Sequence, residues 1–155
     1  MDERLLAPCG LYCGVYAVYQ VTQNQDQRLG GRILEAHQGK LPMGGAMTLQ
    51  DIACQGCLSG QTFAYCQHCP VRLCSKERGL EGCHQCGQFP CLFMESFPHP
   101  TGKKVILRAV PGRRQVGAEE WARRALRRYQ CPRCGQQLFM GARRCPGCQE
   151  NVDLD

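Results

Sequence analysis

Residues 54–91 read CQGCLSGQTFAYCQHCPVRLCSKERGLEGCHQCGQFPC and place eight cysteines within thirty-eight residues. The spacing is C-x2-C-x8-C-x2-C-x4-C-x8-C-x2-C-x4-C, and its C-x2-C-x4-C unit occurs twice, seventeen residues apart. A C-x2-C turn can bring two sulfurs to one metal ion at about 2.3 Å, which fills half of a tetrahedral site. Two ions with four thiolates each would use all of the cysteines, which are Cys54, Cys57, Cys66, Cys69, Cys74, Cys83, Cys86 and Cys91.

The spacing leaves open how these eight cysteines share their ions. Sequential pairing would give one site from the first four and another from the last four, whereas cross-braced pairing would interleave them. Zinc is the expected ion because closed four-thiolate sites are its usual structural form. An iron–sulfur cluster is the alternative, since soft thiolate sites accept both metals. Neither of the common ferredoxin spacings, C-x2-C-x2-C-x3-C-P or C-x4-C-x2-C, occurs here.

The composition also favours metal. The chain has 155 residues with 14 cysteines, 18 glycines and 9 prolines, so a large apolar core is not expected, and small cores normally need disulfides or metals. The first residues, MDERLLAPCG, lack the apolar run of a signal peptide, and no segment approaches the length of a membrane span. We therefore expect a cytoplasmic protein that does not enter a membrane. In a reducing compartment CxxC pairs are metal ligands or redox thiols more often than disulfides.

A second cysteine motif lies at residues 131–148, CPRCGQQLFMGARRCPGC, with the spacing C-x2-C-x10-C-x2-C. It resembles the short zinc ribbons in which two knuckles flank a small hairpin. We expect a strand over 137–140, a turn at 141–142, and one structural site made by Cys131, Cys134, Cys145 and Cys148. Together with the central cysteines, this predicts two or three zinc ions.

The remaining cysteines, Cys9 and Cys13, lie in the segment APCGLYC. They could complete a third site with a central cysteine, form a redox-active thiol pair, or be buried thiols. The first interpretation is favoured because the pair lies in a tight segment flanked by glycine.

The positive charge is concentrated in the last third of the chain. Residues 103–155 hold twelve Lys/Arg against five Asp/Glu, whereas residues 1–102 hold seven against eight. In the helix expected over 118–130, apolar residues share one face and arginines the other. This asymmetry favours an anionic partner, either nucleic acid or an acidic protein. The candidate contacts to nucleic acid are Arg123, Arg124, Arg127, Arg128, Arg133, Arg143 and Arg144.

The predicted fold is a small α+β, metal-stabilised and loop-rich protein, with a cysteine-rich zinc-binding domain and a C-terminal zinc ribbon. Helices are expected after Gly14, over 28–37 and over 72–79, with a loop at 39–48. The expected organisation is a cysteine-rich domain at 1–97, a linker at 98–117, an amphipathic Arg-rich helix at 118–130 and a zinc ribbon at 131–150.

No catalytic motif stands out, because the chain has neither a recognisable nucleophile elbow nor a phosphate-binding loop. We therefore expect a protein with structural four-cysteine zinc sites that acts as an adaptor or binding module for protein or nucleic acid, and not an enzyme. The alternative is an iron–sulfur or thiol redox protein that uses the central cysteines or the Cys9–Cys13 pair.

Several motifs in this order, CGLYCG, CQGCLSG, YCQHCPVRLC and KERGLEGCHQCGQFPC, with a terminal CPRCG, resemble an uncharacterised prokaryotic cysteine-rich family, a domain of unknown function. The resemblance covers residues 5–97 and implies metal binding and a cytoplasmic location, without an established reaction. Members typically begin with CGxxCxxC, whereas this chain has Tyr16 at the third cysteine position. A metal site that needs three ligands from the opening motif is therefore in doubt.

Overall fold

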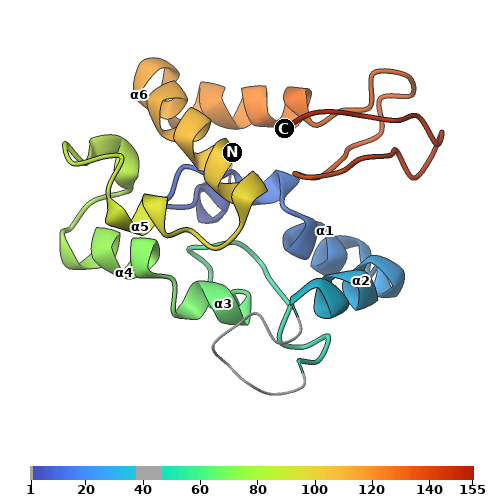
Figure 1. The fold of residues 1–155 in the computed structure, drawn as a ribbon, viewed down its shortest axis with the longest axis horizontal. Helices are drawn as coiled ribbons and strands as arrows, with labels where there is room; N and C mark the ends of the chain where they lie inside the picture. Colours follow the sequence, from blue (N-terminus) through green and yellow to red (C-terminus); the bar gives the residue numbers. More distant parts are fainter. Residues whose placement is uncertain (1, 38–46) are drawn as a thin grey trace.

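A computed structural model describes residues 2–37 and 47–155 (Figure 1). Most of the loop expected at 39–48 lies outside the described residues. Three short 3-10 helices and six α-helices form the regular structure of the described ranges: η1 (Glu3–Leu5), η2 (Cys13–Val15), α1 (Ala17–Asn24), α2 (Gln27–His37), α3 (Ala64–Gln67), α4 (Pro70–Glu77), η3 (Cys83–Gln85), α5 (Leu92–Glu95) and α6 (Pro100–Arg128). The helices predicted after Gly14, over 28–37 and over 72–79 correspond to α1, α2 and α4.

Extended structure is scarce. In the described ranges it consists of isolated bridges that join Leu6 to Tyr12, Gln130 to Gln137, and Arg144 to Asn151. About half of the chain is helical, so the predicted α+β class is not confirmed. The hairpin expected between the two C-terminal knuckles is also not seen, because each knuckle closes on itself through its own bridge.

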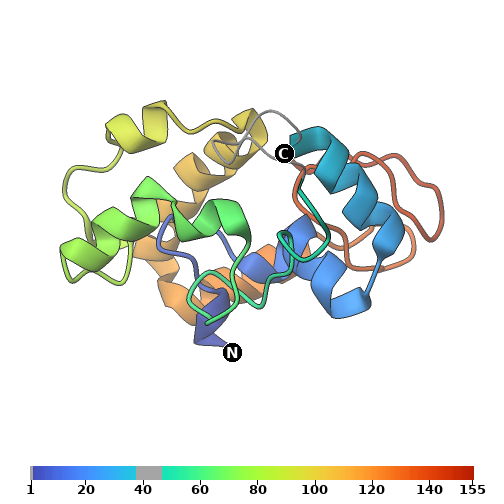
Figure 2. The same ribbon diagram turned by 90° about the horizontal axis from the view of Figure 1, so that it is seen from below.

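The amino-terminal segment runs through the middle of the molecule. Figure 1 shows it beneath α6, with α3, α4 and α5 to one side and α1 and α2 to the other, and Figure 2 shows the same arrangement from below. Leu5, Leu6 and Val15 from this segment are buried against Ala125 of α6 and against Tyr129, which directly follows the helix. The short segment that carries Cys9 and Cys13 is therefore held between helices that come from distant parts of the sequence.

Helix α6 replaces the linker that was expected at 98–117. It begins at Pro100, where a proline suits the first turn of a helix. It is interrupted at Gly117, whose φ of 77° and ψ of 174° are non-helical. The bend lets the second limb return over the first, and a Cβ on Gly112 would lie 2.7 Å from the ring of Trp121. The Trp121 Nε1–H donates to the Gly10 carbonyl at 3.0 Å, which fixes this corner to the amino-terminal segment.

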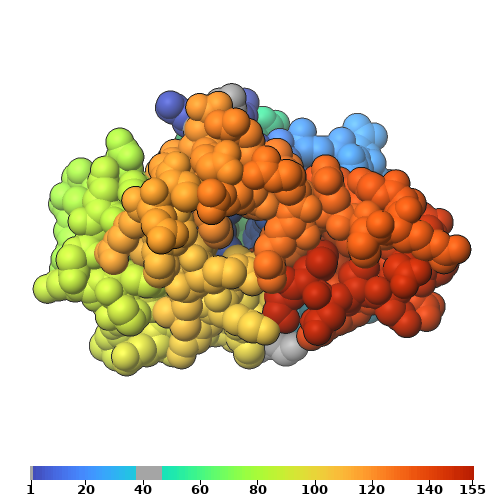
Figure 3. All heavy atoms as spheres, turned by 90° about the horizontal axis from the view of Figure 1, so that it is seen from above, coloured from blue at the N-terminus to red at the C-terminus, as the bar shows by residue number. Residues whose placement is uncertain are grey.

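The second limb of α6 has the two faces that its sequence predicts. Ala122, Ala125 and Tyr129 are buried. Arg123 and Arg127, on the other face, are exposed. The bent helix covers a hollow of about 230 Å³, which Figure 3 shows with amino-terminal residues at its floor. None of the helices in the described ranges is both long enough and apolar enough to cross a bilayer.

Candidate metal centres

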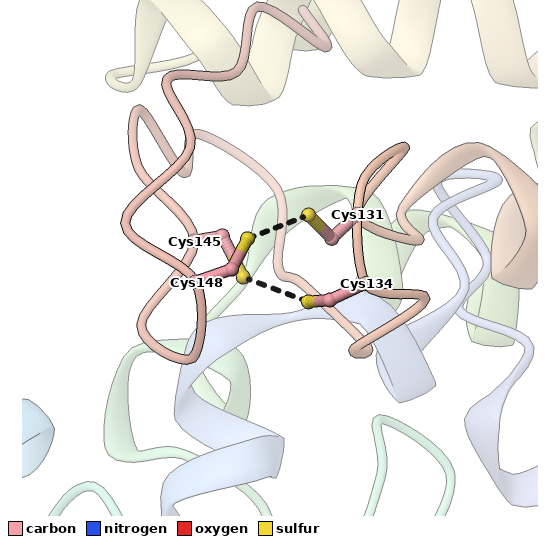
Figure 4. A group of neighbouring side chains, drawn as sticks. All are labelled: Cys131, Cys134, Cys145 and Cys148. Atoms are coloured by element: carbon pink, nitrogen blue, oxygen red, sulfur yellow. Dashed lines mark hydrogen bonds between the residues drawn. The ribbon is translucent and has the colours of Figure 1, made fainter.

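Four cysteine sulfurs meet at the carboxyl-terminal end of α6 (Figure 4). The Sγ atoms of Cys131, Cys134, Cys145 and Cys148 all lie within 4.8 Å of one another. Cys131 and Cys148 are 3.5 Å apart, and Cys134 and Cys145 are 3.6 Å apart. Four sulfurs at 2.3 Å from one tetrahedral ion would be about 3.8 Å apart, so this arrangement can hold a single metal ion.

Two loops with the same backbone hydrogen bonds supply these sulfurs. In each loop the first cysteine's N–H donates to the carbonyl five residues later, at 2.9 Å in one loop and 2.8 Å in the other. The N–H four residues after that cysteine donates back to its carbonyl. The residue that makes this return bond has a left-handed backbone in both loops, with φ of 75° at Gly135 and 60° at Gln149. The repeated geometry turns both cysteines of each loop toward the other loop.

Backbone N–H groups at the site favour a charged sulfur. The N–H groups of Cys134 and Arg133 are directed at the Cys131 sulfur and, together with the Cys148 and Cys145 thiols, lower its pKa to about 6. A thiol becomes a metal ligand as its thiolate, so these amides prepare Cys131 for binding.

The site made by these four cysteines is attached to the helical core. Its first loop is joined to the end of α6 by the Leu138 N–H, which donates to the Tyr129 carbonyl at 2.6 Å. The Met140 N–H donates to the Val15 carbonyl at 2.8 Å, and the Gln20 side chain donates to the Leu138 carbonyl at 3.0 Å. The first cysteine loop and the residues that follow it therefore rest on the amino-terminal segment and α1.

The last four central cysteines surround a small cavity. Cys74, Cys83, Cys86 and Cys91 line about 20 Å³ of space, together with apolar side chains that include Met94. A space of this size accommodates one water-sized particle. Burial and the neighbouring thiols of Cys91, Cys86 and Cys74 raise the pKa of Cys83 to about 11.

The other six N-terminal cysteines form a second group, which we call the six-thiol group. It adjoins the first, because Cys9 and Cys69 pack in the same apolar cluster as Cys83 and Cys91. Burial raises the pKa of Cys66, and charge interactions with Cys57, Cys13, Cys69 and Cys54 raise it further. Cys9 interacts in the same way with Cys57, Cys69 and Cys13. The group therefore consists of Cys9, Cys13, Cys54, Cys57, Cys66 and Cys69.

Backbone N–H groups are also directed at the six-thiol group. The Gly56 N–H donates to the Cys54 sulfur at 3.5 Å. The Leu11 and Cys57 N–H groups lower the pKa of Cys9 and Cys13 respectively, although burial dominates and raises both. Among the described residues, the C-terminal set alone has three or more ligand atoms within 4.8 Å of one another. Metal binding by the central cysteines and by Cys9 and Cys13 stays a prediction.

Tyr16 lies against the six-thiol group, at the position where members of the resembled family have a cysteine. Burial raises the pKa of its hydroxyl, and Cys66, Cys13, Cys54 and Cys9 raise it further. The phenol therefore stays protonated beside the thiols.

The arginines predicted to contact nucleic acid are exposed, but several already have acidic neighbours. Glu120 lies 2.9 Å from Arg124, 3.1 Å from Arg127 and 3.5 Å from Arg123. In the C-terminal loops, Arg133 pairs with Glu150 at 3.5 Å and Arg143 with Asp153 at 3.2 Å. The Arg128 side chain donates to the Leu154 carbonyl, and that of Arg144 to Asn151.

The fold and the four-thiol site define a small, helical, cysteine-rich protein with a site suited to a metal ion. The chain belongs to the family described as "Protein of unknown function (DUF3795)", whose model matches residues 5–96. The matched region contains ten of the cysteines and ends before α6 and the C-terminal site. No curated protein and no solved structure matched the chain.

The predicted resemblance to a cysteine-rich domain of unknown function is thus confirmed, whereas the zinc-ribbon assignment of the C-terminus is not. Sequence reasoning missed Arg113, which is buried beside Cys9 and Glu81. The only signal in the sequence was its position among many other arginines, which does not distinguish a buried one.

Proposed function

We propose that this chain is a zinc-binding protein with structural four-cysteine sites. The observation that carries the proposal is the C-terminal arrangement of four sulfurs within 4.8 Å, held by two loops of matching backbone geometry. All four positions of a tetrahedral ion are filled by protein ligands, and closed sites of this kind are structural. Binding would supply folding free energy to a segment that contains little regular structure, on the order of 10–16 kcal/mol for isolated zinc peptides.

The cavity lined by Cys74, Cys83, Cys86 and Cys91 supports a second site of the same kind. Its size suits one ion, and its four cysteines are the last four of the central stretch. The proposal therefore assigns these four cysteines to one ion, as the sequential pairing would. The Arg114 side chain donates to the carbonyls of Cys83, His84 and Cys86, which holds two of these cysteines in place.

The C-terminal site is tested by removing one sulfur. In the full chain, purified without added metal, Cys134→Ser should lower the bound zinc by about one ion per chain, since one tetrahedral ion needs all four ligands. Metal content is measured by mass spectrometry. Arg133→Gln is the matched control, because it changes the same loop without removing a sulfur.

Unchanged zinc in Cys134→Ser would contradict the proposed site. Iron with acid-labile sulfide at this site would instead support the redox alternative, since thiolates accept both metals.

We further propose that the Arg-rich surface of the second α6 limb and the C-terminal loops binds nucleic acid. The supporting observation is exposure: the side chains of Arg123, Arg124 and Arg127 are 58%, 53% and 60% exposed. Ion pairs at such positions are worth about 0–1 kcal/mol, so phosphates can replace Glu120 at little cost. Arginine suits this role because its planar fork binds two phosphate oxygens.

A further inference from the structure

Arg113 is a buried cation on the first limb of α6. Its side chain is 4% exposed. Its Nε and Nη1 atoms are buried and have no hydrogen-bond partner among the described residues. Burial lowers the pKa of the guanidinium, while Glu81 and Cys9 oppose that effect. The side chain is therefore placed where a positive charge needs a nearby anion.

Glu81 does not satisfy this need. Its carboxylate lies 3.9 Å from Nη2, which is longer than a hydrogen bond, and the Glu81 side chain is 72% exposed. His84, which is also close, carries no negative charge and has its pKa lowered by burial and by Arg113. A buried charge without a partner costs several kcal/mol, so a second source of negative charge is expected here.

Cys9 belongs to the six-thiol group and lies against the first limb of α6, because it packs on the cluster that contains Val110, and a Cβ on the adjoining Gly10 would lie 3.0 Å from the Val110 side chain. The backbone fixes it there: the Cys83 N–H donates to the Pro8 carbonyl at 2.7 Å. A Cβ on Gly82 would lie 2.5 Å from the same oxygen, so the two segments are in close contact. Neutral buried thiols would not compensate a guanidinium, whereas metal-bound thiolates would.

We infer that the six-thiol group binds a thiophilic metal, with Cys9 among the ligands, and that Arg113 is the buried counter-charge of this centre. The inference extends the proposed metal binding to a separate centre. Each thiol that binds loses its proton to solvent, and four thiolates on one divalent ion carry a net charge of −2. A cluster of iron and sulfide on the same thiolates is also anionic, so the role of Arg113 is the same for zinc and for iron.

The ligand part of the inference is tested with Cys9→Ser. We expect this variant, purified as the full chain, to lose metal that Cys134→Ser retains, and the two losses to add in the double variant. Metal and acid-labile sulfide analysis then identifies the occupant as zinc or as an iron–sulfur cluster. Wild-type metal content in Cys9→Ser would overturn the inference and leave the C-terminal site unaffected. Wild-type content in Cys134→Ser alone would overturn the proposed C-terminal site instead.

The counter-charge is tested with Arg113→Met, which removes the charge and keeps an unbranched side chain. Groups that support metal ligands typically change metal affinity by 10–100-fold, so we expect metal release to a chelator to accelerate by at least about tenfold. Arg113→Lys keeps the charge, so its rate of metal release should lie between those of wild type and Arg113→Met. Arg123→Met, an exposed position on the same helix, is the matched control.

Folding is followed by circular dichroism and by the metal content of the C-terminal site. If Arg113→Met does not fold, Arg113→Gln, which also removes the charge, carries the test, and a release rate within about twofold of Arg123→Met in a folded variant without the charge would overturn the role of Arg113.

Discussion

Asp155 shows how one side chain joins three separate parts of this molecule. Its carboxylate accepts hydrogen bonds from the Tyr129 hydroxyl, from the Gly141 N–H at 2.9 Å and from Arg108 at 3.1 Å. The side chain is 5% exposed. Burial alone would raise the pKa of Asp155, but these three donors outweigh it and hold the pKa below its ordinary value. The charged form is therefore the one that stabilises the fold.

We predict that Asp155→Asn lowers the free energy of unfolding at pH 7 by about 1.5–3 kcal/mol, because hydrogen bonds to a buried charge are lost. Denaturant unfolding measures the change. Asp153→Asn is the control. Asp153 pairs with Arg143 but is 84% exposed, so this variant should lose no more than about 1 kcal/mol of the free energy of unfolding.

The pH dependence gives a second check on Asp155. A carboxylate whose pKa is lowered by folding contributes its full stability above the unfolded value of about 3.9, and the contribution is lost as the pH falls through the folded value. The difference in the free energy of unfolding between wild type and Asp155→Asn should therefore be the same at pH 7 and pH 5. A difference that disappears by pH 5 would contradict the assignment.

At the scale of one element, the bend in α6 determines how the N-terminal and C-terminal cysteine regions are connected. The first limb carries Arg113 and packs on η3 and α5, and the second limb leads into the C-terminal cysteines. Gly117 permits the bend because its φ of 77° and ψ of 174° fall in a region that side chains with a Cβ rarely adopt. The direction of the second limb therefore depends on a glycine.

We predict that Gly117→Ala lowers the free energy of unfolding by about 1–3 kcal/mol, because a Cβ is strained in this conformation. No atom lies within 4 Å of the Cβ position, so crowding is not the cause. Gly31→Ala is the matched control, since Gly31 is inside α2 and its Cβ position is equally open. That substitution should be neutral or stabilise by about 0.5–1 kcal/mol. Equal effects of the two changes in thermal or denaturant unfolding would contradict the role of Gly117.

On the scale of the whole molecule, charge and thiols are segregated. The N-terminal cysteines lie in and around the core, whereas seven exposed arginines gather on the second limb of α6 and the adjoining loops, namely Arg123, Arg124, Arg127, Arg128, Arg133, Arg143 and Arg144. The carboxylates of Glu119 and Glu120 partly neutralise this surface. The arginines would attract the phosphates of a nucleic acid, and the two carboxylates would weaken that attraction.

We predict that the Arg123→Gln, Arg124→Gln, Arg127→Gln triple variant binds mixed-sequence double-stranded DNA more weakly than wild type at low salt. Each lost phosphate contact should reduce the slope of log K against log salt by about 0.9. Glu120→Gln should bind more tightly, because it frees the same arginines. Fluorescence anisotropy across a salt series measures both effects.

Absence of wild-type binding to DNA and to mixed-sequence RNA at low salt would refute this proposal. An acidic protein would then be the remaining class of partner for the surface.

The sequence by itself determined the local chemistry of this protein. The C-x2-C spacings identified the four C-terminal cysteines that could hold a metal ion, because two sulfurs three residues apart share a turn wherever that turn is placed. The periodicity of residues 118–130 gave the two faces of the helix for the same local reason. Local rules were insufficient over 98–117, where the two prolines and the glycine of residues 96–103 suggested a linker. The segment is instead helical, because Pro100 lies in the first turn and apolar residues such as Ile106 and Val110 are buried against the core.

Only the tertiary structure decided which distant groups meet. Cys9 lies forty-five residues before Cys54, and Arg113 lies more than twenty after Cys91, yet the fold brings Arg113 and the six-thiol group together. It also places Cys74, Cys83, Cys86 and Cys91 around one small cavity, whereas the spacing alone did not show which cysteines lie together. The physical reason is that spacing constrains only neighbours within a turn. Contacts between segments depend on how the bent α6 packs over the amino-terminal residues, and that packing depends on burial across the whole chain.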